Sequence, residues 1–338
     1  MDFAIFTVCA LAIALAGPVL VRAVEGVGER TGLGHLWLGT VLLAGATSLP
    51  ELVSVVAAAG IDQPDIAVGT VLGSNMFNMT IFGVVLVLFP LAVRTNRAGA
   101  LTGGVAIVLA AATLVFLLSG GGELGHVGGG AIVLLALYVG GSLMLFREDR
   151  RAATASANPD VEAQPASMPH RGDVLQLVAA TAVVFVASLF LPSAAEGIAE
   201  TLGVSGGVVG VVGVALATSL PEVVTSAVAL WRGAPGLVVG NVFGSNVFNV
   251  AVLFPGDLAL DEGPLLAAAM DEQAVTAAFG LLLMLLALAA LVERMPWSSQ
   301  GGRGLLRRSR ALRLLGAGIL AGYLVGVVVT VSLGIETG

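Results

Sequence analysis

The sequence predicts an all-α integral membrane protein with ten transmembrane helices, arranged as two inverted repeats of five helices each. Three observations predict this fold class: long apolar runs, arginines confined to alternate connections, and one polar motif that occurs twice. The chain is 57% hydrophobic and 11% charged, whereas about 25% charged residues are usual in soluble domains. The apolar runs are continuous rather than alternating, which excludes a transmembrane β-barrel.

Ten apolar runs reach the roughly 18 residues that a membrane-spanning helix needs. In chain order they are 3–23, 36–60, 66–91, 100–119, 127–146, 174–192, 206–231, 236–256, 273–292 and 311–333. The first run follows Asp2 rather than a basic segment, and arginines come after it, so we interpret it as a retained helix and not as a signal peptide. The lone cysteine, Cys9, permits no internal disulfide.

Charge is divided cleanly between the connections of these runs. The chain has no lysine, and all fifteen arginines fall in alternate connections. The other connections and both termini hold twelve acids, among them Asp62, Asp65, Asp257 and Asp261, and no arginine. The positive-inside rule then predicts a multi-pass protein of the plasma membrane with both termini outside the cell.

Two halves of five spans are separated by a polar segment. Residues 148–173 are rich in Ala, Ser and Pro, and we expect them to form a flexible cytoplasmic linker between repeats 1–147 and 174–338. Residues 39–80 match 210–251 at 20 of 42 positions without a gap. Because five spans separate the two copies, the second is expected to cross the membrane in the opposite direction, as in many transporters.

The motif "ATSLPE" brings a carboxylate into an apolar span in each half. Of the 22 acids in the chain, only Glu51 and Glu222 lie deep in spans, at equivalent repeat positions. A charge at that depth costs at least about 2.5 kcal/mol on insertion scales, so each is a candidate functional residue. The alternative is a structural carboxyl that is protonated or paired with a cation, but no arginine or histidine lies deep in a span to pair with it. If the two acids are ionised, a bound ion is expected to supply the counter-charge.

Residues with oxygen-bearing side chains lie close to both glutamates in the sequence. On a helix, Thr47 and Ser48 share a face with Glu51, and Pro50 leaves the carbonyl of Ala46 without its usual N–H donor. The second copy repeats this arrangement with Thr218, Ser219, Glu222 and Pro221, the freed carbonyl being that of Ala217.

The partner segments "GTVLGSNMFN" and "GNVFGSNVFN" add a serine and an asparagine each. Ser74 shares a helix face with Asn78, and Ser245 shares one with Asn249, so we predict all four as ligands. Gly69, Gly73, Gly240 and Gly244 are expected to allow close helix packing. For Asn75 and Asn246, two interpretations stay open: packing and helix-end hydrogen bonds, or ligation.

The predicted site therefore contains carboxylate, hydroxyl, amide and carbonyl oxygens, with no thiol or imidazole. Such a set suits hard cations rather than transition metals. Two carboxylates would neutralise one calcium ion or two sodium ions.

"ATSLPE" followed by "GSN-x-FN", present twice in inverted halves, resembles the sodium/calcium exchanger family of the cation/calcium antiporter superfamily, prokaryotic type. The resemblance implies an antiporter that exchanges calcium for sodium by alternating access, with the first and sixth spans sliding across the remaining bundle. It implies ion ligation by the ten side chains named above and by the backbone carbonyls of two alanines: Glu51, Glu222, Asn78, Asn249, Thr47, Ser48, Thr218, Ser219, Ser74, Ser245, Ala44 and Ala215. Some members carry Asp where this chain has Asn249.

Other functions remain as alternatives. A proton/calcium or potassium-dependent antiporter is one, although the proton-coupled branch typically has an acidic "GN-x-x-E" motif where this chain has "GSNMFN" and "GSNVFN". An intramembrane enzyme with a serine nucleophile would need a base nearby, and no histidine lies deep in a span. A passive channel would not need two inverted copies. We expect no enzymatic activity, no cofactor, no nucleic-acid partner and no obligatory protein partner; the expected partners are the bilayer and the calcium and sodium ions.

Overall fold

A computed structural model describes residues 1–90, 97–124, 127–156, 168–202, 218–261, 263–269, 271–292 and 302–337. The described chain is helical apart from one short hairpin. In chain order the elements are α1 (Asp2–Thr31), α2 (His35–Leu38), the π-helix η1 (Gly39–Leu43), α3 (Ala44–Thr47), α4 (Leu49–Ala59), α5 (Pro64–Leu88), α6 (Arg97–Ser119), β1 (Glu123–Leu124), β2 (Val127–Gly128), α7 (Gly129–Ser156), α8 (Arg171–Leu202), α11 (Leu220–Trp231), α12 (Pro235–Ala259), α13 (Leu265–Ala268), α14 (Asp271–Val292) and α15 (Gly302–Thr337).

Among the described residues, eight helices are long and apolar enough to cross a membrane, and a bent pair makes a ninth. These nine correspond to nine of the ten runs in the sequence. The bent pair is the predicted span 36–60, in which the segments Leu36–Thr47 and Leu49–Ala59 meet at 47°. Of the remaining predicted span, 206–231, the structure describes only α11, because residues 203–217 lie outside the described part.

The structure differs from the sequence-based expectation in three places. Helix α7 continues to Ser156 and α8 begins at Arg171, so both ends of the predicted linker 148–173 are helical. The start of the predicted span 127–146 forms an antiparallel strand pair with Glu123–Leu124. Asp257 was expected in an exposed connection, but it is buried in the last turns of α12.

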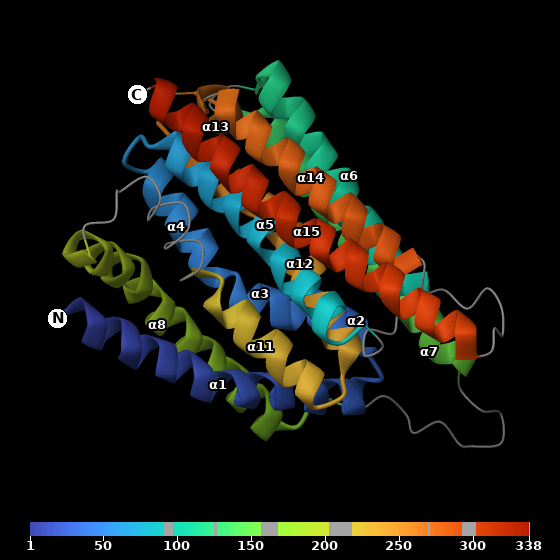
Figure 1. Ribbon diagram of the computed structural model, residues 1–338. Coiled ribbons are helices and arrows are strands. Elements are labelled where there is room, and N and C mark those ends of the chain that lie inside the picture. Colours follow the sequence, from blue (N-terminus) through green and yellow to red (C-terminus); the bar gives the residue numbers. More distant parts are fainter. Residues whose placement is uncertain are drawn as a thin grey trace.

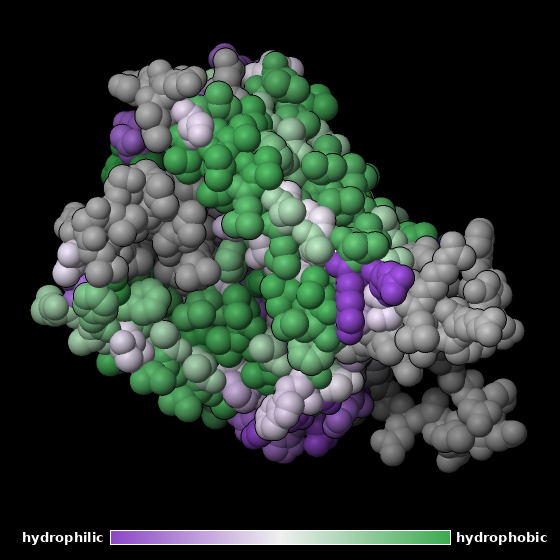
Figure 2. Space-filling model, in the orientation of Figure 1, coloured by the Kyte–Doolittle hydropathy of each residue, from purple (hydrophilic) through white to green (hydrophobic). Residues whose placement is uncertain are grey.

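The helices form a bundle around two central members (Figure 1). Helices α5 and α12 contact each other at the centre, while α6, α14 and α15 pack along one flank and the pair α1–α8 along the other. Apolar residues cover most of the face in Figure 2, and hydrophilic residues gather at its lower edge. Large apolar side chains exposed on α1, α8 and α15, such as Leu15, Phe190 and Leu324, fit an outer surface in contact with lipid.

Contacts between helix ends agree with the division of charge in the sequence. At the arginine-bearing ends, Arg30 pairs with Asp173, Arg97 pairs with Glu148, and Arg232 pairs with Glu25. At acid-bearing ends, the Gln273 amide donates to the carbonyl of Asp65 at 3.4 Å. Helix ends that share a charge class therefore lie together, as alternating spans require.

The two copies of the motif share a backbone conformation at the turn that follows each motif helix. The N–H of Gln63 donates to the carbonyl of Ala58, and in the second copy the N–H of Ala234 donates to that of Ala229. Asp62 has a φ of 54°, and the equivalent Gly233 has a φ of 73°. Asp62 is the one described non-glycine residue with a positive φ, and it has this conformation at the position equivalent to Gly233.

Glycines allow α12 to contact the bent span closely. A Cβ atom at Gly240 would lie 2.8 Å from both the Cα of Gly39 and the backbone nitrogen of Thr40, and one at Gly244 would also meet the backbone of Thr40. The predicted packing role is thus confirmed for these two glycines. A Cβ at Gly69 would make only an ordinary contact with Gln273. A Cβ at Gly73 would have no described atom within 4 Å. The repeat equivalents of Gly39 and Thr40, residues 210 and 211, are outside that part.

We predict that Gly240→Ala lowers the melting temperature of the purified protein in detergent. The added methyl group meets rigid backbone, and overpacking of this kind costs about 1–3 kcal/mol. Gly104→Ala is the matched control, because a Cβ there has nothing within 4 Å. Equal melting temperatures for the two variants would contradict the close backbone contact.

Candidate cation site

Each copy of the motif places its glutamate in the first turn of a helix that begins directly after a serine. Ser48, with φ −94° and ψ 9°, interrupts the helix before α4, and Ser219, with φ −88° and ψ 8°, precedes α11 in the same way. Proline is tolerated in a first turn, because its missing N–H would have no helical partner there. Glu51 and Glu222 therefore lie at helix N-termini, where the helix dipole and free N–H groups favour a negative charge.

All ten predicted ligand side chains are buried, each exposed by at most 1%. Hydrogen bonds join the two halves around the carboxylates. The hydroxyl of Ser48 donates to Oε1 of Glu222 at 3.0 Å, and that of Ser245 donates to the same oxygen at 3.2 Å. The hydroxyl of Ser74 donates to Oε1 of Glu51 at 3.5 Å. A motif from the first half thus contributes directly to the carboxylate of the second.

Five oxygen atoms of the predicted ligands have no hydrogen-bond donor. They are Oε2 of Glu51, Oδ1 of Asn78, Oγ of Ser219, Oε2 of Glu222 and Oδ1 of Asn249. The other three buried side-chain atoms without a partner in the described chain belong to Trp37, Ser188 and Gln273. A buried polar atom left unpaired costs about 1–3 kcal/mol, so five from one predicted ligand set indicate a place for a bound cation.

Two other buried acids, Asp257 and Asp149, have a structural role and differ from Glu51 and Glu222 in their hydrogen bonds. Asp257 accepts the N–H of Leu265 at Oδ1, at 2.8 Å, and the N–H of Gly128 at Oδ2, at 2.7 Å. Asp149 accepts the N–H of Gly34 at 2.7 Å. Both acids fix loops at helix ends. In contrast, Glu51 and Glu222 each keep one oxygen without a donor, and no arginine or histidine is buried in the described chain.

The remaining predicted ligands are two threonines and two alanine carbonyls, and their surroundings differ. The hydroxyl of Thr47 donates to the carbonyl of Ala44 at 3.2 Å, and this carbonyl also accepts the N–H of Ser48 at 2.9 Å. The carbonyl of Ala44 would therefore share its lone pairs if it bound an ion. Thr218 is buried beside Ser219. The predicted ligand Ala215 lies outside the described residues.

Sequence reasoning missed Asn241, which supports Thr47 from the other half. Its Oδ1 accepts the Thr47 hydroxyl at 3.3 Å, and its Nδ2 donates to the hydroxyls of Thr225 and Ser226 at 3.1 and 3.0 Å. The equivalent residue of the first half, Thr70, bonds only to its own helix, at the carbonyl of Ile66. The change from "GTVL" to "GNVF" within an otherwise matching motif was the available signal.

The chemistry of the site fits hard cations. Two carboxylates are combined with neutral hydroxyl and amide oxygens. Nowhere in the described chain are three or more His, Cys, Asp or Glu side chains grouped so that they could hold a metal ion. Calcium takes six to eight oxygen ligands, and such mixed oxygen sets are typical for it.

Comparison with known proteins identifies the family of the chain. Residues 1–147 and 173–332 match the protein family described as sodium/calcium exchanger protein. The chain belongs to this family. It is therefore a multi-pass membrane protein of an exchanger family rather than an enzyme.

Relatives agree with this assignment, and a solved structure shows the same fold. The chain is 29% identical to inner membrane protein YrbG of Escherichia coli over 227 residues, which cover 66% of this chain and 68% of that protein. It is 26% identical to the sodium/calcium exchanger MaX1 of Methanosarcina acetivorans over 69% of this chain and 75% of that protein. A structure of the sodium-calcium exchanger NCX_Mj has the same fold, with a TM-score of 0.72 and 22% identity over 97% of this chain and 98% of that one.

We predict that Glu51→Gln and Glu222→Gln each abolish the rise in melting temperature that calcium causes, without lowering the melting temperature of the ion-free protein. A ligand at about 100 times its Kd stabilises a protein by about 2.7 kcal/mol, and the amide removes the charge that attracts the ion.

Asp257→Asn is the matched control. It places an N–H₂ group against a backbone N–H, so it should lower the melting temperature yet keep the rise with calcium. A normal calcium response in either glutamine variant would contradict the two-carboxylate site.

Proposed function

We propose that this protein is a secondary antiporter that exchanges calcium for sodium across the membrane by alternating access. The observation that carries the proposal is the set of five unpaired oxygens from Glu51, Asn78, Ser219, Glu222 and Asn249. They come from both halves of the chain and from the residues that the two sequence motifs single out. The ligands are the ten predicted side chains, together with the carbonyls of Ala44 and Ala215.

Sodium is proposed as the coupling ion because of ligand chemistry. Sodium and calcium both suit a cage of oxygen ligands, so one flexible site can alternate between them. A proton-coupled site needs acids that release and rebind protons. The proton-coupled branch carries an acid in this part of its motif, whereas Asn78 and Asn249 are amides that do not titrate.

The arrangement of the bundle supports the proposal of alternating access. The proposed architecture is ten spans in two inverted repeats, 1–147 and 174–338, with α1 and α8 as the pair that slides. These helices pack on each other and share a small apolar core of Cys9, Ile13, Ala187 and Leu191, separate from the main one. At one end, α1 is joined to the bundle by the ion pair of Glu25 with Arg232, at 2.6 Å.

Calcium flux in proteoliposomes tests the coupling. With equal pH on both sides, we expect an outward sodium gradient to drive uptake of radiolabelled calcium. In separate liposomes without sodium, we expect a pH gradient to drive no uptake. Liposomes with Glu222→Gln provide the control for leak. Uptake driven by the pH gradient alone would assign the protein to proton/calcium exchange, and calcium flux without stimulation by sodium on the opposite side would indicate a channel.

Membrane orientation has its own test. We expect both termini outside the cell and the segment around Met168 in the cytoplasm. In a Cys9→Ala background, cysteines at Met168 and Asp261, both exposed, should react with an impermeant thiol reagent from opposite sides. Labelling of both from one side would contradict the proposed topology.

A further inference from the structure

The two central helices concentrate the asparagines of the chain. Five of its seven asparagines lie in α5 and α12: Asn75, Asn78, Asn241, Asn246 and Asn249. Each is exposed by at most 3%. Two of them, Asn78 and Asn249, are proposed ligands. Asn75 and Asn246 lie three residues before these ligands in their own helices, yet their hydrogen bonds cross to the other helix.

The first crossed contact has only one possible orientation. Nδ2 of Asn246 lies 3.1 Å from the main-chain oxygen of Asn75, and a carbonyl can only accept, so this atom must be the donor. The other end of the Asn246 amide is then Oδ1, which accepts Nδ2 of Asn78 at 3.0 Å. Asn78 consequently keeps its own Oδ1 free of donors.

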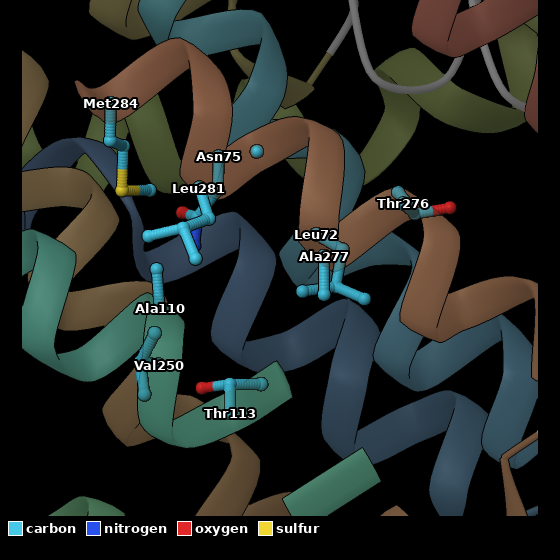
Figure 3. A pocket seen from close by; sticks show the side chains of 10 residues that line it. Leu72, Asn75, Ala110, Thr113, Val250, Thr276, Ala277, Leu281 and Met284 are labelled. Carbon is cyan, nitrogen blue, oxygen red and sulfur yellow. The ribbon is translucent and has the colours of Figure 1, made fainter. Parts of the chain in front are cut away.

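The second crossed contact has the same outcome for Asn249. Its Nδ2 donates to Oδ1 of Asn75 at 3.1 Å, which leaves Oδ1 of Asn249 without a donor. Asn75 also lines a small pocket, beside Leu72, Leu281 and Met284 (Figure 3). None of the ten predicted ligand side chains lines this pocket.

We propose that Asn75 and Asn246 are positioning residues that form a crossed amide clamp, in which each half of the chain orients the amide ligand of the other half. This inference rests on the proposed function, because the clamp acts on proposed cation ligands. A free asparagine can turn either its oxygen or its N–H₂ group toward an ion. The clamp occupies both N–H₂ groups and leaves only the two oxygens for a cation.

Crossing makes the clamp sensitive to the spacing of the central helices. Oδ1 of Asn78 stays available only while α5 and α12 are close enough for Asn246 to hold it, and the same applies to Asn249 and Asn75. A role in packing alone would not depend on which helix carries the partner. Packing would also be maintained by an apolar side chain of similar shape.

A double-mutant cycle on calcium affinity tests the clamp. Asn75→Leu keeps the approximate volume and removes the acceptor, so Asn249 is left with an unpaired N–H₂ group. We expect the calcium Kd, measured by isothermal titration calorimetry on the purified protein, to rise about tenfold to a hundredfold. In an Asn249→Asp background, where no N–H₂ group needs an acceptor, Asn75→Leu should change the Kd less than about threefold.

The control cycle pairs Asn75→Leu with Asn78→Asp. Asn78 lies in the same helix as Asn75 and is held by Asn246. In the Asn78→Asp background, Asn75→Leu should therefore raise the Kd as much as it does in the wild-type protein. Equal effects of Asn75→Leu in the wild-type and Asn249→Asp backgrounds would overturn the clamp. The clamp would also be overturned if Asn78→Asp, rather than Asn249→Asp, reduced the effect of Asn75→Leu on the calcium Kd. Asn75 would then act on the ligand in its own helix.

An ion-independent measurement separates the clamp from the proposed function. Selective ¹⁵N labelling of asparagine gives seven side-chain amide groups, and Asn75→Leu should shift the signal of Asn249 but not that of Asn78. If the wild-type protein bound no calcium, the proposed function would fail while this shift still supported the clamp. If calcium bound normally and the Asn249 signal did not move, the clamp would fail alone.

Discussion

A carboxylate buried in a membrane protein must be compensated, and the arrangement around Glu51 and Glu222 follows from this constraint. No basic side chain is buried in the described chain, so two sources of compensation are present, the N-termini of α4 and α11 and the hydroxyls of neighbouring serines, and the proposed function adds a third, a bound ion. The first two satisfy only one oxygen of each carboxylate. The broken helices exist because a continuous helix would offer no N-terminus at that depth. Glycines at the crossing of α12 and η1 then allow the oxygen atoms of both halves to converge.

The two halves are similar without being equivalent, and the differences are polar. Ser48 and Ser245 both donate to Glu222, whereas among the described residues one side-chain hydroxyl, that of Ser74, donates to Glu51. Asn241 of the second half accepts the hydroxyl of Thr47 in the first half, whereas the equivalent Thr70 bonds to the carbonyl of Ile66 in its own helix. Such asymmetry gives the two carboxylates different surroundings, which suits the proposed exchange of two ions of different charge. Calcium and sodium differ in charge far more than in the oxygen ligands they accept.

Much of this arrangement could be predicted from the sequence, because membrane burial makes polar residues conspicuous. The apolar runs located nine of the spans, and the motifs identified side chains that prove to be buried together. Asp257 could not be assigned correctly, because it accepts the N–H groups of Leu265, in the turn after α12, and of Gly128, which is 129 residues away in the sequence. The orientation of Asn75 and Asn246 likewise depends on contacts between α5 and α12. Helix periodicity shows which residues share a face; it does not show which face of another helix they meet.

The central claim is that the unpaired oxygens of both halves surround one cation site. Crystals of the protein grown with calcium, or with strontium as a heavier substitute, test it through anomalous scattering. The account predicts a divalent-ion peak about 2.3–2.6 Å from Oε2 of both Glu51 and Glu222, with Oδ1 of Asn78 or Asn249 facing it. A peak bound by only one half of the chain, or one at the buried carboxylates Asp149 or Asp257, would contradict it.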